Sequence, residues 1–254
     1  MRTFNIILLL SSLAYCQDST MDQLATIKSS DGFVNIRLKP DSASEVVALL
    51  HPDGIFYFSP ENTKGGWSPI EFQTDTAWLP LGERQLILKH FKPDGNNVYI
   101  EGYLSESEIQ PLSKFPRIEF EKRRETGNSI YLENDSITFF LSSADFNPAK
   151  HNLSTINDEQ YVDGLKAWGR DWGVPMTEIS SIKFTLSGKP VLISKCDYTN
   201  LYEPNFREFH FYSGVNGEIF FHMMNSDGGA VYDAVFLIKD GKCKLIFIDL
   251  NPYD

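Results

Sequence analysis

The sequence predicts an all-β protein built from two successive domains. In Asp31–Leu50, apolar and polar residues alternate, break at Pro40 and resume, as in two strands joined by a turn. In the second half, turn dipeptides that end in Gly or Asn recur between short apolar segments. We find no long segment with the helical period of about 3.6 residues, and 254 residues suffice for one or two domains.

The first domain begins near Ile27, after a polar stretch, Asp18–Thr26, which we interpret as a linker or a frayed terminus. Alternation should bury Val34, Ile36, Val46, Leu49 and Tyr103. The expected elements are strands at Phe33–Leu38, Val46–Leu50, Ile55–Phe58 and Trp67–Phe72, a hairpin of Leu86–Phe91 with Val98–Tyr103, a helical turn at Ser105–Glu108, and a closing strand at Ile109.

Residues 27–113 resemble a bacterial SH3 domain. The matching residues, in chain order, are Gly32, Val34, Asn35, Ile36, Arg37, Pro40, Ser44, Val46, Trp67 after Gly65-Gly66, and Gly102-Tyr103-Leu104. The resemblance implies an SH3-like barrel, and Gln73–Glu83 is sequence beyond the compact family pattern.

Residues 117–254 predict a second antiparallel β domain, either a sandwich or an open barrel. Ile156–Lys166 is the one stretch where a helix competes with strands. The turn dipeptides are Gly127-Asn128, Asp163-Gly164, Ser187-Gly188, Asn216-Gly217 and Asp240-Gly241. The expected strands are Ile182–Leu186, Val191–Ile193, Phe209–Tyr212, Glu218–Met223, Val231–Ile238 and Lys242–Asp249.

Three segments of this half are similar to the C-terminal part of certain uncharacterised exported bacterial proteins. They are Trp168–Pro175, Tyr198–Asn205 and Met224–Tyr232. The resemblance implies architecture and carries no mechanism.

The N-terminus predicts export to the periplasm, the cell surface or the medium. Residues 1–17 combine Arg2, an apolar run at Phe4–Leu13 and small residues before Gln17, as in a signal peptide. Two alternatives stay open, simple cleavage or lipidation at Cys16. No later segment is long and apolar enough for a transmembrane helix in the mature chain.

The net charge of −11 argues against nucleic acid as a partner, because nucleic-acid sites need basic patches. The chain has one local basic run, Lys122-Arg123-Arg124, which is flanked by acids and fits a solvated strand face.

The sequence predicts no catalytic residue, cofactor or metal site. Cys196 lacks the flanking residues of a papain-like wall hydrolase, and neither a Gly-x-Ser-x-Gly elbow nor a His-Glu-x-x-His zinc motif is present. Asn225-Ser226-Asp227-Gly228 lacks the acids of an EF-hand, which favours a tight turn. Cys196 and Cys243 are either a disulfide, as export permits, or two buried thiols in strands.

The candidate ligand-binding residues lie in loops that carry aromatic and polar groups beside Gly or Pro, a composition suited to sugar or peptide. They are Trp168, Asp171, Trp172, Tyr198, Tyr202, Glu203, Asn225 and Asp227. The alternative is that the aromatic residues plug the end of the β domain.

We therefore expect a non-catalytic binding protein of the bacterial envelope, whose partner is cell-wall peptide, glycan or an envelope protein. The competing classes are an envelope-polymer hydrolase with carboxylates in the second domain, and a structural or inhibitory exported protein.

Overall fold

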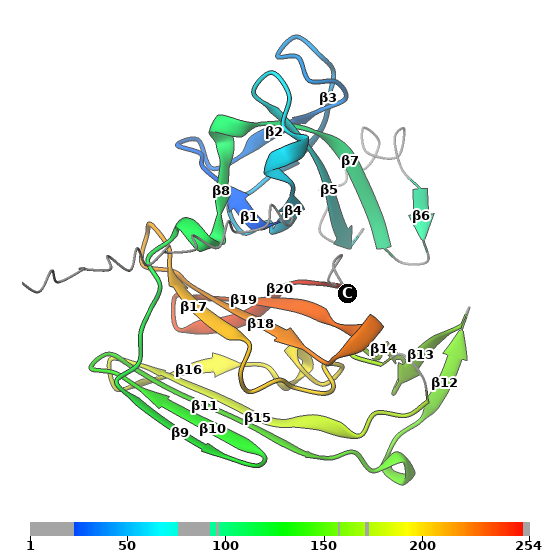
Figure 1. The fold of residues 1–254 in the computed structure, drawn as a ribbon, viewed down its shortest axis with the longest axis vertical. Coiled ribbons are helices and arrows are strands. Elements are labelled where there is room, and N and C mark those ends of the chain that lie inside the picture. The colour runs from blue at the N-terminus through cyan, green and yellow to red at the C-terminus, as the bar shows by residue number, and fades with distance from the viewer. Residues whose placement is uncertain (1–22, 76–91, 95–96, 157, 171–172, 251–254) are drawn as a thin grey trace, which may run out of the picture.

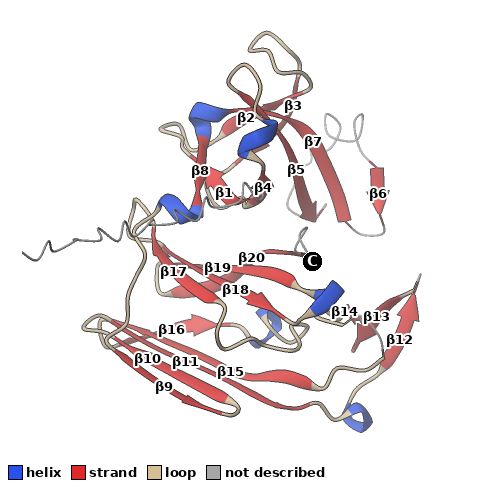
Figure 2. Ribbon diagram, viewed as in Figure 1, coloured by secondary structure: helices blue, strands red, loops and turns tan. Residues whose placement is uncertain are grey.

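The computed structural model describes residues 23–75, 92–94, 97–156, 158–170 and 173–250. Figure 1 shows two β units in contact, and the only helical segments in the described residues are 3-10 turns of three residues (Figure 2). The all-β prediction is confirmed. The signal peptide and Cys16, the loop residues Trp78, Leu79 and Leu81, and the predicted strand Leu86–Phe91 lie outside the described residues.

The N-terminal unit is an eight-stranded antiparallel sheet in the order β3-β2-β7-β5-β4-β1-β8, with β6 also paired to β7. Its strands are β1 (Gln23–Ile27), β2 (Val34–Arg37), β3 (Val46–Leu50), β4 (Phe56–Phe58), β5 (Trp67–Asp75), β6 (Lys92–Asp94), β7 (Asn97–Ser105) and β8 (Ile109–Pro111). The predicted helical turn is η3 (Glu106–Glu108), and it leads directly into the closing strand β8. Two further 3-10 turns are η1 (Pro60–Asn62) and η4 (Leu112–Lys114).

Three details of this unit differ from the prediction. The polar stretch expected as a linker contains β1, which is held between β4 and β8 and buries Ala25 and Ile27. Residues 92–94, expected to lie in the turn between the two hairpin strands, form β6. In β3 the buried residues are Val47, Ala48 and Leu50, whereas Val46 and Leu49 are half-buried, as is Tyr103. The pairing of β2 with β3 shifts register after Ile36, and this changes which side chains of β3 face the core.

The C-terminal unit is a strongly curled nine-stranded half-barrel in the order β17-β18-β19-β20-β16-β15-β11-β10-β9 (Figure 1). Its strands are β9 (Lys122–Thr126), β10 (Ser129–Glu133), β11 (Ile137–Asp145), β15 (Thr177–Leu186), β16 (Lys189–Ile193), β17 (Phe209–Ser213), β18 (Ile219–Asn225), β19 (Tyr232–Lys239) and β20 (Lys242–Leu250). All neighbours pair antiparallel except β16 and β20, whose short parallel contact joins two antiparallel sets. Three 3-10 turns lie in this half: η5 (Pro148–Lys150), η6 (Lys195–Asp197) and η7 (Gly228–Ala230).

The stretch Ile156–Lys166, for which the sequence left helix and strand open, belongs to a small separate sheet. Its strands are β12 (Leu153–Ile156), β13 (Glu159–Val162) and β14 (Leu165–Lys166). Asp163 and Gly164 have φ angles of 53° and 83°, and this left-handed pair closes the tight β13–β14 turn. The turn ends any helix there, so turn chemistry outweighed the weak helical pattern.

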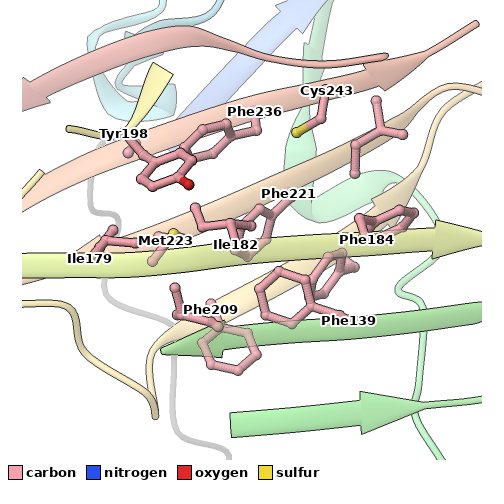
Figure 3. Close-up of a cluster of buried hydrophobic side chains, with 14 of the residues drawn as sticks. Phe139, Ile179, Ile182, Phe184, Tyr198, Phe209, Phe221, Met223, Phe236 and Cys243 are labelled. Carbon is pink, nitrogen blue, oxygen red and sulfur yellow. The ribbon is translucent and has the colours of Figure 1, made fainter. Parts of the chain in front are cut away.

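Aromatic side chains fill the inside of the half-barrel (Figure 3). The ring of Phe139 on β11 lies 5.0 Å from that of Phe211 on β17 and 4.8 Å from that of Phe221 on β18. Because β11 and β17–β18 belong to opposite walls of the curled sheet, these contacts close the core. The interior is therefore packed side chains rather than a channel.

The two units meet at a seam that we define by one apolar cluster: Ile55, Leu112, Phe220, Val235, Leu237 and Phe247. The last four side chains come from the outer face of β18–β20, whose inner face supplies the half-barrel core. Phe115 in the connector stacks on Phe220 with ring centroids 5.5 Å apart. Strands β18 and β19 are thus covered on both faces, which explains their nearly continuous apolar sequence.

Candidate functional site

The three loops singled out from the sequence meet at one end of the half-barrel, which we call the loop end. Ser226 links the third loop to both others: its N–H donates to the Glu203 carbonyl (2.9 Å) and its hydroxyl to the Gly169 carbonyl (3.0 Å). Tyr202 N–H donates to the Trp168 carbonyl (3.1 Å). The arrangement that a shared site requires is therefore present, while ligand binding there stays a prediction.

Glu203 is the polar centre of the loop end. Its Oε1 accepts a hydrogen bond from Met176 N–H (2.6 Å), and its Oε2 accepts one from the Thr177 hydroxyl (2.7 Å). Arg170 Nη1 lies 3.8 Å from Oε1. The residue sits at φ 51°, a left-handed conformation uncommon for a side chain of this size. This carboxylate therefore holds two loops together, and both of its oxygens already accept hydrogen bonds within the protein.

The three aromatic candidates among the described residues are buried, so they do not form the expected exposed aromatic surface. Trp168, Tyr198 and Tyr202 have exposed fractions of 6%, 8% and 1%. The first two belong to the half-barrel core, and Tyr202 packs edge-on against Phe146. The alternative interpretation, in which these rings plug the end of the domain, is the one that fits their positions.

The remaining candidates divide into buried, exposed and undescribed residues. Asn225 is fully buried and accepts a hydrogen bond from Asn205 N–H (3.1 Å), so it has a structural role between two loops. Asp227 is exposed beside η7. Asp171 and Trp172 lie outside the described residues.

Two donors at the loop end lack a partner. The Nε atom of Arg170 and the Nδ2 atom of Asn225 are buried without a hydrogen-bond acceptor among the described residues. An unsatisfied buried donor costs about 1–3 kcal/mol, so an oxygen from a ligand or a water is expected to meet it.

A second polar group flanks the loop end at His151. Its Nδ1 pairs with Asp163 Oδ2 (2.7 Å), and its Nε2 lies 3.7 Å from Glu178 Oε2. Hydrogen bonds from Asn152 N–H and from His151 lower the pKa of Asp163. Burial, reinforced by the carboxylates of Glu178 and Asp163, raises the pKa of Tyr202 to about 12. The phenol therefore stays neutral at physiological pH.

The cysteine pair is present as two free thiols, Cys196 exposed and Cys243 buried. Burial, followed by the negative charge of Asp197, raises the pKa of Cys243 to about 12. A thiol in that environment is a poor nucleophile. The thiols are separate, and the interpretation as two buried thiols in strands holds for Cys243 in β20 but not for Cys196, which is exposed in η6.

A polar cluster at the seam was not predicted. Asp233 is 2% exposed and bridges the two units, accepting from the Tyr57 hydroxyl (2.5 Å) and lying 2.5 Å from His222 Nε2. Burial, followed by the positive charge of Arg117, lowers the pKa of the neighbouring His210. Alternation in β18 and β19 places His222 and Asp233 on the same outer face. The contact with Tyr57 could not be predicted in this way, because Tyr57 is 176 residues from Asp233 in sequence.

The described residues contain no group of three His, Cys, Asp or Glu side chains arranged to hold a metal ion. Within the same ranges, no helix has the length and hydrophobicity needed to cross a bilayer. Comparison with known proteins found no matching family model, no matching curated protein and no matching solved structure.

Proposed function

We propose that this chain is an exported, non-catalytic binding protein of the bacterial envelope, with an SH3-like barrel in its N-terminal unit and oxygen-rich cell-wall peptide or glycan as its ligand. The half-barrel would carry the ligand at the loop end. Export, through a cleaved or lipidated N-terminus, follows from the charged and apolar start of the sequence.

The observation that carries the SH3-like assignment is how the motif residues pack on one another. A Cβ on Gly102 would lie 2.4 Å from Ile36 Cγ2 and 2.9 Å from the Arg37 carbonyl, so only glycine fits there. Ile36 and Leu104 are both 0% exposed. The residues that carry the resemblance thus form one packed unit, which is a physical reason for their occurring together.

Binding is favoured over catalysis because the carboxylates are structurally engaged. Glu203 is held by three neighbours and Asp163 by two. A glycosidase would need two carboxyl groups separated by room for substrate. The unpartnered Arg170 Nε instead fits recognition of an oxygen atom.

The test is sedimentation of the purified chain with isolated peptidoglycan, together with turbidity and soluble-fragment measurements. Binding without loss of turbidity is expected. Asp227→Ala should weaken binding to peptidoglycan, since this exposed carboxylate borders the loop end. Asp240→Asn on the β19–β20 turn should leave binding unchanged. Released fragments would instead support a hydrolase, and neither binding nor release would favour a structural or inhibitory protein.

A further inference from the structure

The end of the half-barrel opposite the loop end is open. At the loop end, Trp168 and Tyr202 seal the core beneath the loops, whereas at the other end the wall is concave, with a volume of about 460 Å³. This is within the range of about 300–1,000 Å³ seen for small-ligand sites. We call it the groove. It lies where the connector to β9 crosses the ends of β11, β15 and β18.

The floor of the groove is aliphatic. Ile137 and Ile219 are core residues at the first positions of β11 and β18, and Ile118 and Leu186 pack partly against the same core. Antiparallel pairing sets Ile137 directly opposite Leu186. Ile137 and Ile219 are only 4% and 6% exposed, so the apolar surface that a ligand could cover comes mainly from the half-buried side chains of Ile118 and Leu186 above them.

The rim of the groove is acidic. Glu119, Glu121 and Asp135 line it, and all three are exposed. Arg117 lies 3.4 Å from Glu119, while Glu121 and Asp135 make no ion pair with a described residue. The Asn134 side-chain amide donates to the Glu119 carbonyl, which fixes the connector over the β10–β11 turn. The rim thus adds local negative charge to a chain whose net charge is −11.

We propose that the groove binds a peptide through a lysine-like side chain, with its aliphatic stem on the isoleucine and leucine floor and its ammonium among the rim carboxylates. Long cationic side chains bury their methylene groups along apolar surface and keep the charge in water, which this geometry accommodates. A carboxylate ligand would be repelled, and a neutral aliphatic ligand would leave the rim unused. The inference goes beyond the proposed envelope function and does not depend on it.

The test is methyl NMR of the full chain titrated with three capped tripeptides: acetyl-Ala-Lys-Ala-amide, its norleucine counterpart and its glutamate counterpart. Exposed ion pairs contribute about 0.2–1 kcal/mol each, so two of them predict roughly 2- to 30-fold tighter binding of the lysine peptide than of the norleucine peptide. Shifts should occur at the methyls of Ile118, Ile137 and Ile219, and 0.5 M salt should weaken them. Equal binding of lysine and norleucine peptides, shifts centred on Ile179 in the core, or no shifts at all would overturn the proposal.

Variants separate the rim from the floor. Glu121→Gln combined with Asp135→Asn should reduce lysine-peptide affinity to that of the norleucine peptide. Ser136→Trp, an exposed position in the groove, should block both peptides without touching the core. Asp145→Asn combined with Asp53→Asn is the matched control, because it also removes two exposed negative charges and both lie outside the groove. Asp145 is on the same strand as Ile137, about 26 Å away at the strand rise of about 3.3 Å per residue. If the control weakens binding as much as the rim variant, the effect is net charge alone and the groove is excluded.

Discussion

Replacing Tyr57 with phenylalanine should lower the free energy of unfolding by about 1.5–3 kcal/mol, the range for a hydrogen bond to a charged group. The hydroxyl donates to Asp233 Oδ2 at 2.5 Å across the seam, and Asp233 is 2% exposed. Phenylalanine keeps the edge-on ring contact with Phe247 at 5.4 Å, so packing should change little. The lower half of the range is favoured, because Asp233 retains His222.

Removing the carboxylate should cost more than removing the hydroxyl. Asp233→Ala leaves Tyr57 and His222 without their shared acceptor, and breaking a buried pair in this way costs about 3–5 kcal/mol. In a double-mutant cycle, Tyr57→Phe and Asp233→Ala should couple by about 0.5–3 kcal/mol.

The assay is urea unfolding of the full chain followed by tryptophan fluorescence and circular dichroism in parallel. If the two units unfold separately, the seam variants should widen the gap between the two transitions. Tyr131→Phe is the control, because its hydroxyl donates to Glu133 between half-buried positions of β10, outside the seam, and its loss should cost less than that of the Tyr57 hydroxyl. A loss below about 0.5 kcal/mol for Tyr57→Phe, the level of ordinary surface changes, would refute a seam held by Asp233.

Four further outcomes are expected. Burial, reinforced by Glu71 and Asp233, raises the pKa of Asp249 to about 6; its folded pKa lies above its unfolded one, so unfolding free energy should fall as pH rises from about 4 to 6. Asp249→Asn should flatten that slope, and an unchanged slope would contradict the assignment. In a chain lacking Cys16, a thiol reagent should modify Cys196 in the native state and Cys243 only after unfolding, whereas two unreactive cysteines would indicate a disulfide. Ile36→Asp should cost at least about 4 kcal/mol in urea unfolding, combining a lost aliphatic side chain with a buried charge, and a cost below about 1 kcal/mol would mean the strand face is assigned wrongly. Gly102→Ala should destabilise by about 1–3 kcal/mol through the collision with Ile36, and a neutral result would show that the strands can separate there.

Local sequence was sufficient where turn chemistry and alternation agree. Ser187-Gly188 and Asp240-Gly241 have paired positive φ angles, which only turn-forming residues adopt readily, and each joins two strands at the expected place. By contrast, β1 was missed because its five residues do not alternate between apolar and polar. It is stabilised by its pairing with β4 and β8, which are distant in sequence. The three strands at Leu153–Lys166 were missed because their apolar residues are few, and all but Tyr161 and Val162 are exposed.

For the candidate site, the sequence identified the loops but not the state of their side chains. Gly and Pro mark Trp168–Pro175 and Tyr198–Asn205 as irregular segments, and they do meet. Whether Tyr202 faces solvent or core depends on Phe146, 56 positions earlier along the chain, and no periodicity within the loop encodes that contact. An aromatic residue in a loop is equally suited to a ligand and to a plug until its neighbours are known.

The amino-acid sequence by itself determined the β class, the positions of the tight turns and most strands of the half-barrel, because these depend on backbone preferences and on the two-residue alternation of side chains. Tertiary structure alone decided three features: the closure of the loop end, the open groove at the opposite end, and the placement of Tyr57 against Asp233. Each depends on which distant strands become neighbours, and that choice follows from burying the most apolar surface over the whole chain rather than from any local segment.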